Sequence, residues 1–243
     1  MIELRHRSVD DINTTTQLLY DQLYRHASVT QHWDSFYEWI IALLRPQQGA
    51  RLLDVSCGTG QLLKVARQAQ LQALGIDFST VAVCQAQIHG TAWVANGERL
   101  PIADQSFDYV LNLGSLEHFE NMTMGVQEMA RVLKPDGTGC ILVPNTFGLF
   151  WTIWHAKNTG DIFDDGQPLQ RYGTHQQWKK LLEKNGLVVR QTVAYELPPP
   201  QTLSQLVFYV RHPKVHMTKL LLWRFVPVNL ASMFVFLCGR KNV

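Results

Sequence analysis

The sequence contains no long uninterrupted hydrophobic run, few cysteines and no basic cluster beyond Lys179-Lys180. Its 243 residues include 22 Lys and Arg against 20 Asp and Glu, and this near balance argues against a nucleic-acid partner. The most apolar stretch, residues 219–237, is interrupted by charged residues and a proline, so we expect no membrane-spanning helix. Contact of this stretch with a membrane surface is left as an alternative.

The cysteines are scattered, and no two of them form a C-x-x-C pair. They are Cys57, Cys84, Cys140 and Cys238. Such spacing fits neither a disulfide framework nor a zinc site, and no other set of residues has metal-ligand spacing, so we expect no metal. The first residues also lack the apolar core of a secretory signal. We therefore interpret the cysteines as buried reduced thiols of a cytoplasmic protein.

A chain of this length, with 46% apolar residues, can form one large α/β domain. From residue 51 onward, strand-like apolar runs alternate with helical patterns, which predicts βαβ units and a parallel sheet. The expected strands are residues 51–55, 73–77, 92–96, 107–113, 138–143, 187–196 and 231–239. The expected helices are residues 61–69, 80–88, 122–133 and 174–184. Residues 1–45 show helical spacing and no strand.

Residues 52–61 read Leu-Leu-Asp-Val-Ser-Cys-Gly-Thr-Gly-Gln, a buried strand that breaks into glycines before a helix. Such a turn lets a ligand lie against bare backbone, and the helix N-terminus offers unpaired N–H groups. Asp54, at the strand end, can bind the loop's N–H groups or a ligand's ammonium group. Leu63 stands where the third glycine of a dinucleotide fingerprint belongs, and a G-K-[ST] ending is absent. The stretch predicts a cofactor loop.

Asp54-Val-Ser-Cys-Gly-Thr-Gly resembles the first motif, D-x-G-x-G-x-G, of class I S-adenosylmethionine (SAM)-dependent methyltransferases, with Ser56 at the first glycine. Asp77 follows about seventeen residues past the glycine loop, near the offset of a ribose-binding acid. Residues 96–108 resemble the family's G-D-A-x-x-L-P-F-x-D-x-S-F-D segment, and Leu-Lys-Pro-Asp-Gly at residues 133–137 is a further match. The resemblance spans about residues 52–145.

The resemblance implies a Rossmann-like α/β fold: seven mostly parallel strands with helices on both faces and strand seven antiparallel. It also implies SAM as the cofactor. The residues it assigns to cofactor binding are Asp54, Ser56, Gly58, Gly60, Asp77, Phe78, Asn96, Gly97 and Leu113. Asp77 would accept hydrogen bonds from both ribose hydroxyls, and the amide oxygen of Asn96 would accept from the adenine amino group. The backbone carbonyl near Leu113 would meet the ammonium group.

Because the sulfonium of SAM already makes the methyl group electrophilic, the protein has mainly to align an acceptor and exclude water. A base is needed only if the acceptor must lose a proton. His118 is the first candidate, and His155 and Tyr172 are later ones. A loop histidine bonded to backbone is the alternative for His118, and we expect Glu117 to face solvent.

The loop after the fourth strand lacks the [DN]-P-P-[YF] motif of enzymes that methylate nucleobase amino groups or glutamine amides. We therefore expect a small-molecule acceptor that is apolar, aromatic or sugar-bearing; a lipid or quinone is left open. Two aromatic-rich insertions, residues 146–173 and 197–230, would shape its pocket, although a second small core explains most of these aromatics equally well. The second insertion contains Phe208, Tyr209, Trp223 and Phe225.

The sequence thus predicts a single domain, residues 1–243. Residues 1–45 form a helical lid or a helix pair packed at the domain edge, residues 46–145 the SAM-binding core, and residues 231–243 the last strand. The favoured function is SAM-dependent O-methylation of a small molecule. A non-catalytic methyltransferase-like scaffold subunit is the alternative, and an NAD-dependent oxidoreductase comes third. The oligomeric state is not predicted.

Overall fold

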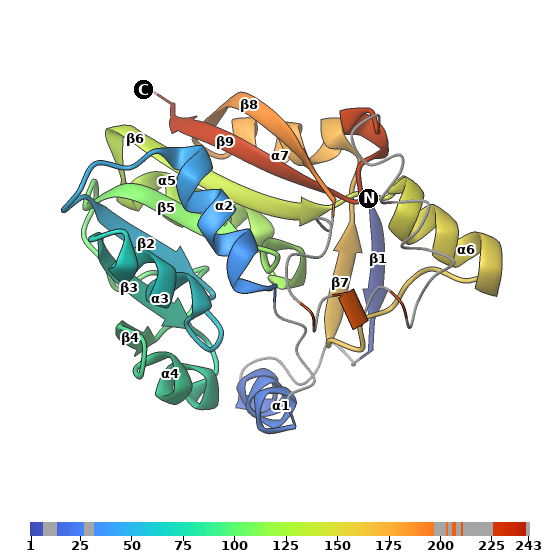
Figure 1. Ribbon diagram of the computed structural model, residues 1–243, viewed down its shortest axis with the longest axis horizontal. Coiled ribbons are helices and arrows are strands. Elements are labelled where there is room, and N and C mark those ends of the chain that lie inside the picture. The colour runs from blue at the N-terminus through green and yellow to red at the C-terminus, as the bar shows by residue number, and fades with distance from the viewer. Residues whose placement is uncertain are drawn as a thin grey trace.

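The computed structural model describes residues 1–6, 14–26, 32–196, 203, 206–207, 210 and 226–241. Its main sheet has seven strands in the order β4-β3-β2-β5-β6-β9-β8 (Figure 1). Their bounds are β2 Arg51–Val55, β3 Gln72–Asp77, β4 Thr91–Val94, β5 Phe107–Leu113, β6 Leu133–Pro144, β8 Leu187–Tyr195 and β9 Met233–Arg240. The pairs from β4 to β6 are parallel, and β9 runs antiparallel to both β6 and β8. The predicted sheet, with its last strand antiparallel, is confirmed.

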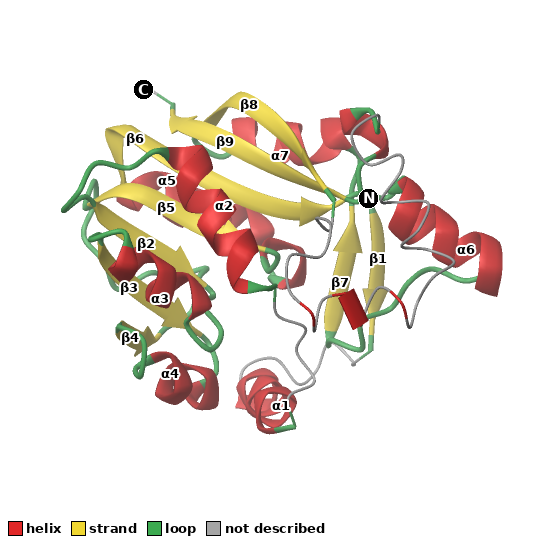
Figure 2. Cartoon of the chain, viewed as in Figure 1, coloured by secondary structure: helices red, strands yellow, loops and turns green. Residues whose placement is uncertain are grey.

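Helices cover both faces of this sheet (Figure 2). On one face, α2 (Asp34–Leu44) and α3 (Gln61–Gln68) bury apolar side chains against β2 and β9. On the other face, α5 (Met122–Val132) and α7 (His175–Lys184) close a core with β5, β6 and β9. A smaller cluster lies under α4 (Thr80–Ala86), which Ser79 caps through its side chain. The three clusters make the sheet a rigid support for its strand ends.

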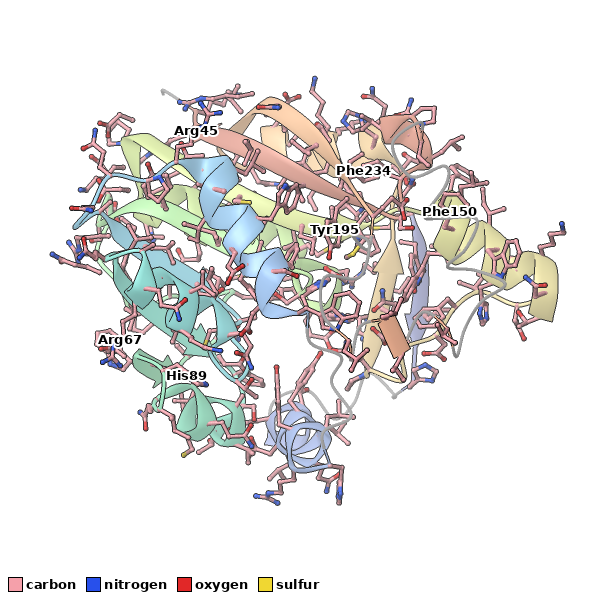
Figure 3. The ribbon with its side chains drawn as sticks, in the orientation of Figure 1. Arg45, Arg67, His89, Phe150, Tyr195 and Phe234 are labelled. Atoms are coloured by element: carbon pink, nitrogen blue, oxygen red, sulfur yellow. The ribbon has the colours of Figure 1, made fainter. Side chains whose placement is uncertain are left out.

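The segment expected to be a lid divides into two different parts. Helix α2 belongs to the core, because Phe36 and Ile40 are fully buried and Trp39 stacks on Tyr195 at a ring distance of 5.5 Å. Tyr195 lies at the end of β8 beside this helix (Figure 3). Helix α1 (Thr14–Arg25) instead lies at the lower edge of the molecule in Figure 1, in contact with α4.

The expectation that residues 1–45 contain no strand was wrong. Strand β1 (Ile2–Arg5) pairs antiparallel with β7 (Leu169–Tyr172), inside the first insertion. Four residues are too few to display a period-two pattern, and the partner lies far along the chain, so local sequence carries no signal for this pairing. The pair is fixed by Arg171, whose Nε donates to Glu3 Oε2 at 2.7 Å.

The first insertion holds little other regular structure. A π-helical turn, Leu149–Ile153, runs into α6 (Trp154–Thr159), which lies beyond β1 at the edge of the molecule (Figure 1). The aromatic residues expected in the second insertion, Phe208, Tyr209, Trp223 and Phe225, lie outside the described residues.

Strand β6 begins at Leu133, earlier than the expected residue 138, because residues 133–137 form a bulge within the strand. Phe107 faces Leu133 and Tyr109 faces Thr138, so four residues are accommodated between the two pairs. Of the cysteines, Cys57, Cys140 and Cys238 are buried as expected, whereas Cys84 is exposed. Within the described part of the chain, no helix has the length and apolar character needed to cross a bilayer.

Candidate functional site

A cavity of about 290 Å³ lies where the carboxyl ends of β2, β3, β4 and β5 meet. This is the edge at which ligands bind in open α/β sheets, and the volume is near the lower limit of ligand pockets, about 300 Å³. Seven of the residues predicted from sequence to bind the cofactor line it: Ser56, Gly58, Asp77, Phe78, Asn96, Gly97 and Leu113. The other two, Asp54 and Gly60, are not among the residues that line the cavity.

The loop after β2 has the left-handed backbone that its glycines allow. Gly58 has φ 51° and Gly60, the N-cap of α3, has φ 86°. Ser56, at the position of the family's first glycine, also has a positive φ of 66°, which costs a non-glycine residue about 1–2 kcal/mol. The loop therefore keeps the glycine-like geometry even where serine stands.

Asp77, at the end of β3, orients this loop. Its Oδ2 accepts a hydrogen bond from the N–H of Gly58 at 2.9 Å, and its Oδ1 accepts from the N–H of Ser79 at 2.8 Å. Burial raises the pKa of Asp77 to about 6, against the lowering effect of these backbone N–H groups. The carboxylate thus lies at the cavity wall with its position fixed, as a ribose-binding acid requires.

Asp54 is buried behind the wall. Burial, followed by the charge of Asp77, raises the pKa of Asp54 to about 8. It is therefore a structural carboxyl group beneath the loop, and the structure does not bring it to the cavity surface where a ligand's ammonium group would lie.

The loops after β4 and β5 form the opposite wall. Asn96 Oδ1 accepts a hydrogen bond from the N–H of Glu98 at 2.8 Å, which fixes the turn. A Cβ on Gly97 would lie 2.6 Å from the Phe119 ring, so only glycine fits there. Asn112 ties the end of β5 to β2, because its Nδ2 donates to the carbonyl of Val55 at 3.1 Å.

His118 lines the cavity with both ring nitrogens engaged. Its Nδ1 meets the carbonyl oxygen of Leu169 at 2.5 Å, so Nδ1 carries the proton, and Nε2 accepts from the side-chain amide of Gln167 at 3.0 Å. That amide also donates to Asp165 Oδ2 at 2.9 Å. Burial lowers the pKa of His118, which keeps the ring neutral and leaves a lone pair on Nε2.

The other two catalytic candidates lie away from the cavity. Tyr172 is buried, and its hydroxyl donates to the carbonyl of Phe163 at 2.9 Å. His155 is on α6, where its ring meets Phe163 edge to face at 5.3 Å. Because both side chains belong to the packing of the first insertion, the geometry supports neither as a base for this cavity.

Glu117 was expected to face solvent, but the structure buries it. Its side chain is 3% exposed, and burial raises its pKa to about 8. It lies in the 3₁₀ turn Leu116–His118, under β7, the strand that the sequence did not predict.

Sequence reasoning missed much of the cavity's outer wall. Helix α1 contributes Thr16, Tyr20 and Tyr24, and the residues before and within α2 contribute His32 and Tyr37. Glu98, Phe119, Glu120 and Gln167 complete this group. The density of aromatic rings with polar tips in residues 20–37 was the available signal, but it did not say which of them face the cavity.

The lining suits SAM. Its acidic side chains, among the described residues, are Asp77, Glu98 and Glu120, and SAM carries a sulfonium cation. The loops that contain Gly58 and Gly97 line it from opposite sides, and Asp77, the acid expected to bind a ribose, lies at its wall. No group of three metal-ligating side chains occurs among the residues described.

The known proteins that resemble this chain include methyltransferases. Residues 53–141 match a family model described as a methyltransferase domain. A probable tRNA methyltransferase 9B from Mus musculus is 32% identical over 146 residues, covering 58% of this chain and 30% of that protein. A ubiquinone/menaquinone biosynthesis C-methyltransferase from Geotalea uraniireducens is 32% identical over 152 residues, covering 56% of this chain and 63% of that protein.

Among solved structures, a SAM-dependent methyltransferase from Thermotoga maritima matches with a TM-score of 0.64 at 16% identity, over 93% of this chain and 99% of that one. At this identity the likeness shows the shared fold. The present chain spans less than two thirds of the length of the two curated relatives.

Proposed function

This chain carries a class I SAM-dependent methyltransferase domain, and from that premise we propose that it transfers a methyl group from SAM to a hydroxyl oxygen of a small, uncharged molecule. The acceptor class is drawn from the cavity's own chemistry. One curated relative is named as a tRNA methyltransferase and the other as a C-methyltransferase of ubiquinone and menaquinone biosynthesis. These names differ in acceptor, so the likeness alone does not identify the acceptor of this chain.

The observation that carries the proposal is the charge of the cavity wall. Among the described residues that line it, none is Lys or Arg. Burial lowers the pKa of His32 to about 4 and also lowers that of His118, so both rings are neutral at pH 7. A phosphate or carboxylate acceptor would find no Lys or Arg in this lining and would meet two acids, Glu98 and Glu120, the second of which is paired with Arg5 at 3.1 Å. An uncharged acceptor meets no such penalty.

His118 is the proposed base. The Leu169 carbonyl holds the Nδ1 proton, so the lone pair is on Nε2, and an acceptor hydroxyl would replace the Gln167 amide as the partner of Nε2. The hydroxyl proton would pass to Nε2 as the oxygen takes the methyl group from the sulfonium, whose sulfur–methyl bond breaks to leave a neutral thioether. SAM, when bound, supplies the electrophilic methyl group. The nearby Asp165 carboxylate, 3.6 Å from Nε2, would stabilise the imidazolium.

The aromatic outer wall supports an acceptor with an apolar or aromatic body. Tyr20 and Tyr24 of α1 and Tyr37 of α2 present rings with polar tips to the cavity. Such side chains cover a ligand, exclude water and still offer hydrogen bonds to its polar groups. In this proposal α1 acts as the lid.

The test has two steps. Calorimetric titration compares SAM and NAD binding to the wild type, Asp77→Ala and Asp136→Asn, where Asp136 is an exposed control on the β6 bulge. We expect micromolar SAM binding that Asp77→Ala abolishes and the control retains, with no NAD binding. Methyl transfer from labelled SAM is then measured with neutral phenols, the matching phenyl phosphates and bulk tRNA.

Transfer to neutral phenols but not to phosphates or tRNA supports the proposal. Absence of SAM binding by folded protein contradicts the enzyme assignment and favours a scaffold subunit. Labelling of tRNA contradicts the acceptor class while leaving the methyl transfer intact.

A further inference from the structure

We propose that Asp21 is a positioning residue that holds α1 closed over the SAM cavity by binding Ser79. This inference rests on the proposed SAM site. Neither Asp21 nor Ser79 lines the cavity, and neither belongs to a motif that the sequence analysis identified as cofactor-binding. Their role is instead to fix the wall that α1 contributes.

Asp21 is a carboxylate buried on a helix at the edge of the domain. It is 7% exposed, and its Oδ1 accepts hydrogen bonds from Ser79 Oγ at 2.5 Å and from the N–H of Val81 at 3.2 Å. A carboxylate buried in this way is stable only because charge-assisted hydrogen bonds replace its hydration. Moving α1 away from α4 would break both of these bonds.

Gln17, one helical turn earlier on α1, binds the same corner of the structure. Its Nε2 donates to the carbonyl of Phe78 at 3.0 Å and lies 3.4 Å from Thr80 Oγ1. Among the described residues, the side-chain hydrogen bonds of Gln17 and Asp21 end on residues 78–81, which include the link between β3 and α4 and the first residues of α4. Helix α1 is attached to the strand end that carries Asp77.

Two separate routes join α1 to the Asp77 carboxylate. In the first, Asp21 binds the hydroxyl of Ser79, whose N–H donates to Asp77 Oδ1. In the second, the hydroxyl of Tyr24 lies against Gly58, 3.1 Å from where a Cβ would be, and the Gly58 N–H donates to Asp77 Oδ2. The lid and the predicted ribose-binding acid are thus parts of one connected unit.

The position of α1 matters because its residues face the cavity. Thr16, Tyr20 and Tyr24 lie on one side, and Asp77 and Phe78 on the other. Helix α1 therefore covers one side of a ligand bound between them, and in this proposal its attachment slows the ligand's release. Weakening the Asp21–Ser79 bond should therefore speed ligand release, because closure and binding are thermodynamically linked.

The experiment measures SAM binding, which needs no acceptor. Calorimetry and stopped-flow dissociation are run on the wild type, Asp21→Asn, Ser79→Ala and the double variant, with Asp34→Asn as the matched control. Asp34 is also an acid on an N-terminal helix, but its partner is the exposed Lys64. We expect Asp21→Asn to raise the SAM Kd about tenfold, mainly through faster dissociation, and the control to change it by less than about twofold.

Hydrogen exchange separates positioning from a general loss of structure. In the wild type, SAM should increase protection of residues 14–26, and in Asp21→Asn that increase should be lost while α3 and β2 stay protected. If the pair acts as a unit, Asp21→Asn should add little to the Kd of Ser79→Ala. Should Asp21→Asn fail to fold, Gln17→Met removes the neighbouring attachment and is expected to weaken SAM binding in the same way.

The outcomes are distinguishable. A wild type that does not bind SAM contradicts the proposed function itself. A wild type that binds SAM, with an unchanged Kd and dissociation rate in Asp21→Asn and Gln17→Met, overturns the assignment of Asp21 and leaves the proposed function standing.

Discussion

Gly60 and Ala86 lie so close together that a Cβ on Gly60 would be 2.8 Å from the Cα of Ala86. Gly60 is the N-cap of α3, and Ala86 is the last residue of α4. The contact brings the two helices together behind the loop that contains Gly58. Two separate features require glycine at this position: its φ of 86°, and the lack of space for a Cβ next to Ala86.

Gly60→Ala should therefore lower the free energy of unfolding more than a positive φ alone requires. Gly49→Ala is the matched control, because Gly49 has φ 76° and a Cβ added to it would meet nothing within 4 Å. We expect about 1–2 kcal/mol for Gly49→Ala from backbone strain, and a further ~1–3 kcal/mol for Gly60→Ala from overlap. Chemical denaturation measures both, and equal losses would contradict the packing argument.

The buried Glu117 should make the protein less stable as the pH rises. Its pKa is about 8 in the fold and near 4.5 when unfolded, so between these values the folded state binds a proton that the unfolded state has released. Stability from this group is complete below pH 4.5 and falls by about 1.4 kcal/mol per pH unit toward pH 8.

Glu117→Gln should remove this contribution, giving a variant more stable than the wild type at pH 8 and closer to it at pH 5. Denaturation at the two pH values provides the measurement. Asp54, whose pKa is also about 8, remains in both proteins, so a reduced slope is expected and not a flat one. An unchanged slope would mean that Glu117 is ionised in the fold.

Trp178 should be far more sensitive to truncation than Trp93. It is fully buried on α7, and its Nε1 donates to the carbonyl of Pro144 at 2.8 Å. Trp178→Phe leaves that carbonyl without this donor and opens a cavity, at an expected cost of about 2–4 kcal/mol. Trp93→Phe, at a half-exposed position, should cost less than about 0.5 kcal/mol. Thermal and chemical unfolding of the pair would show the difference.

His32 should remain neutral well below the usual range for histidine. Burial lowers its pKa to about 4, and its ring packs on Phe36 at 4.1 Å. NMR titration of labelled histidines should show no protonation of His32 at pH 5.5. A midpoint near 6.5 would mean that the cavity wall gains a positive charge in mildly acidic solution, which would weaken the argument for an uncharged acceptor.

The parts of the fold that sequence predicted are those whose signal is local. Residues 51–55 and 107–113 form strands with the expected bounds, and α7 (His175–Lys184) begins one residue after the expected start at 174. Strand β1 escaped prediction because its partner is remote. Glu117 was expected to face solvent for the same reason. It is covered by β7, and β7 pairs with the remote strand β1.

The residues of the candidate site also fall into those that local sequence predicts and those that depend on remote contacts. Asp77 and the glycine loop could be found because strand ends and glycines have fixed positions in a βα unit. Tyr24 and Gln167 could not, because they reach the cavity from segments whose placement depends on contacts with residues 58 and 118. No spacing in the sequence encodes that placement. His155 and Tyr172 were chosen by residue type alone, but the structure directs both side chains to Phe163 and not to the cavity.

The pairing of Ile2 with Tyr172 sets an order of events during synthesis. A ribosome adds about 5–20 residues per second, so β1 waits roughly 10–30 s for its partner to emerge. Until then Ile2 and Leu4 have no sheet to join, and Gln167 has not reached the cavity wall. Strands β2 to β5, whose ends form the inner wall of the cavity, are synthesised long before this, so the outer wall is added to a pocket that has waited for residues 167–172, while β8 and β9 follow later still.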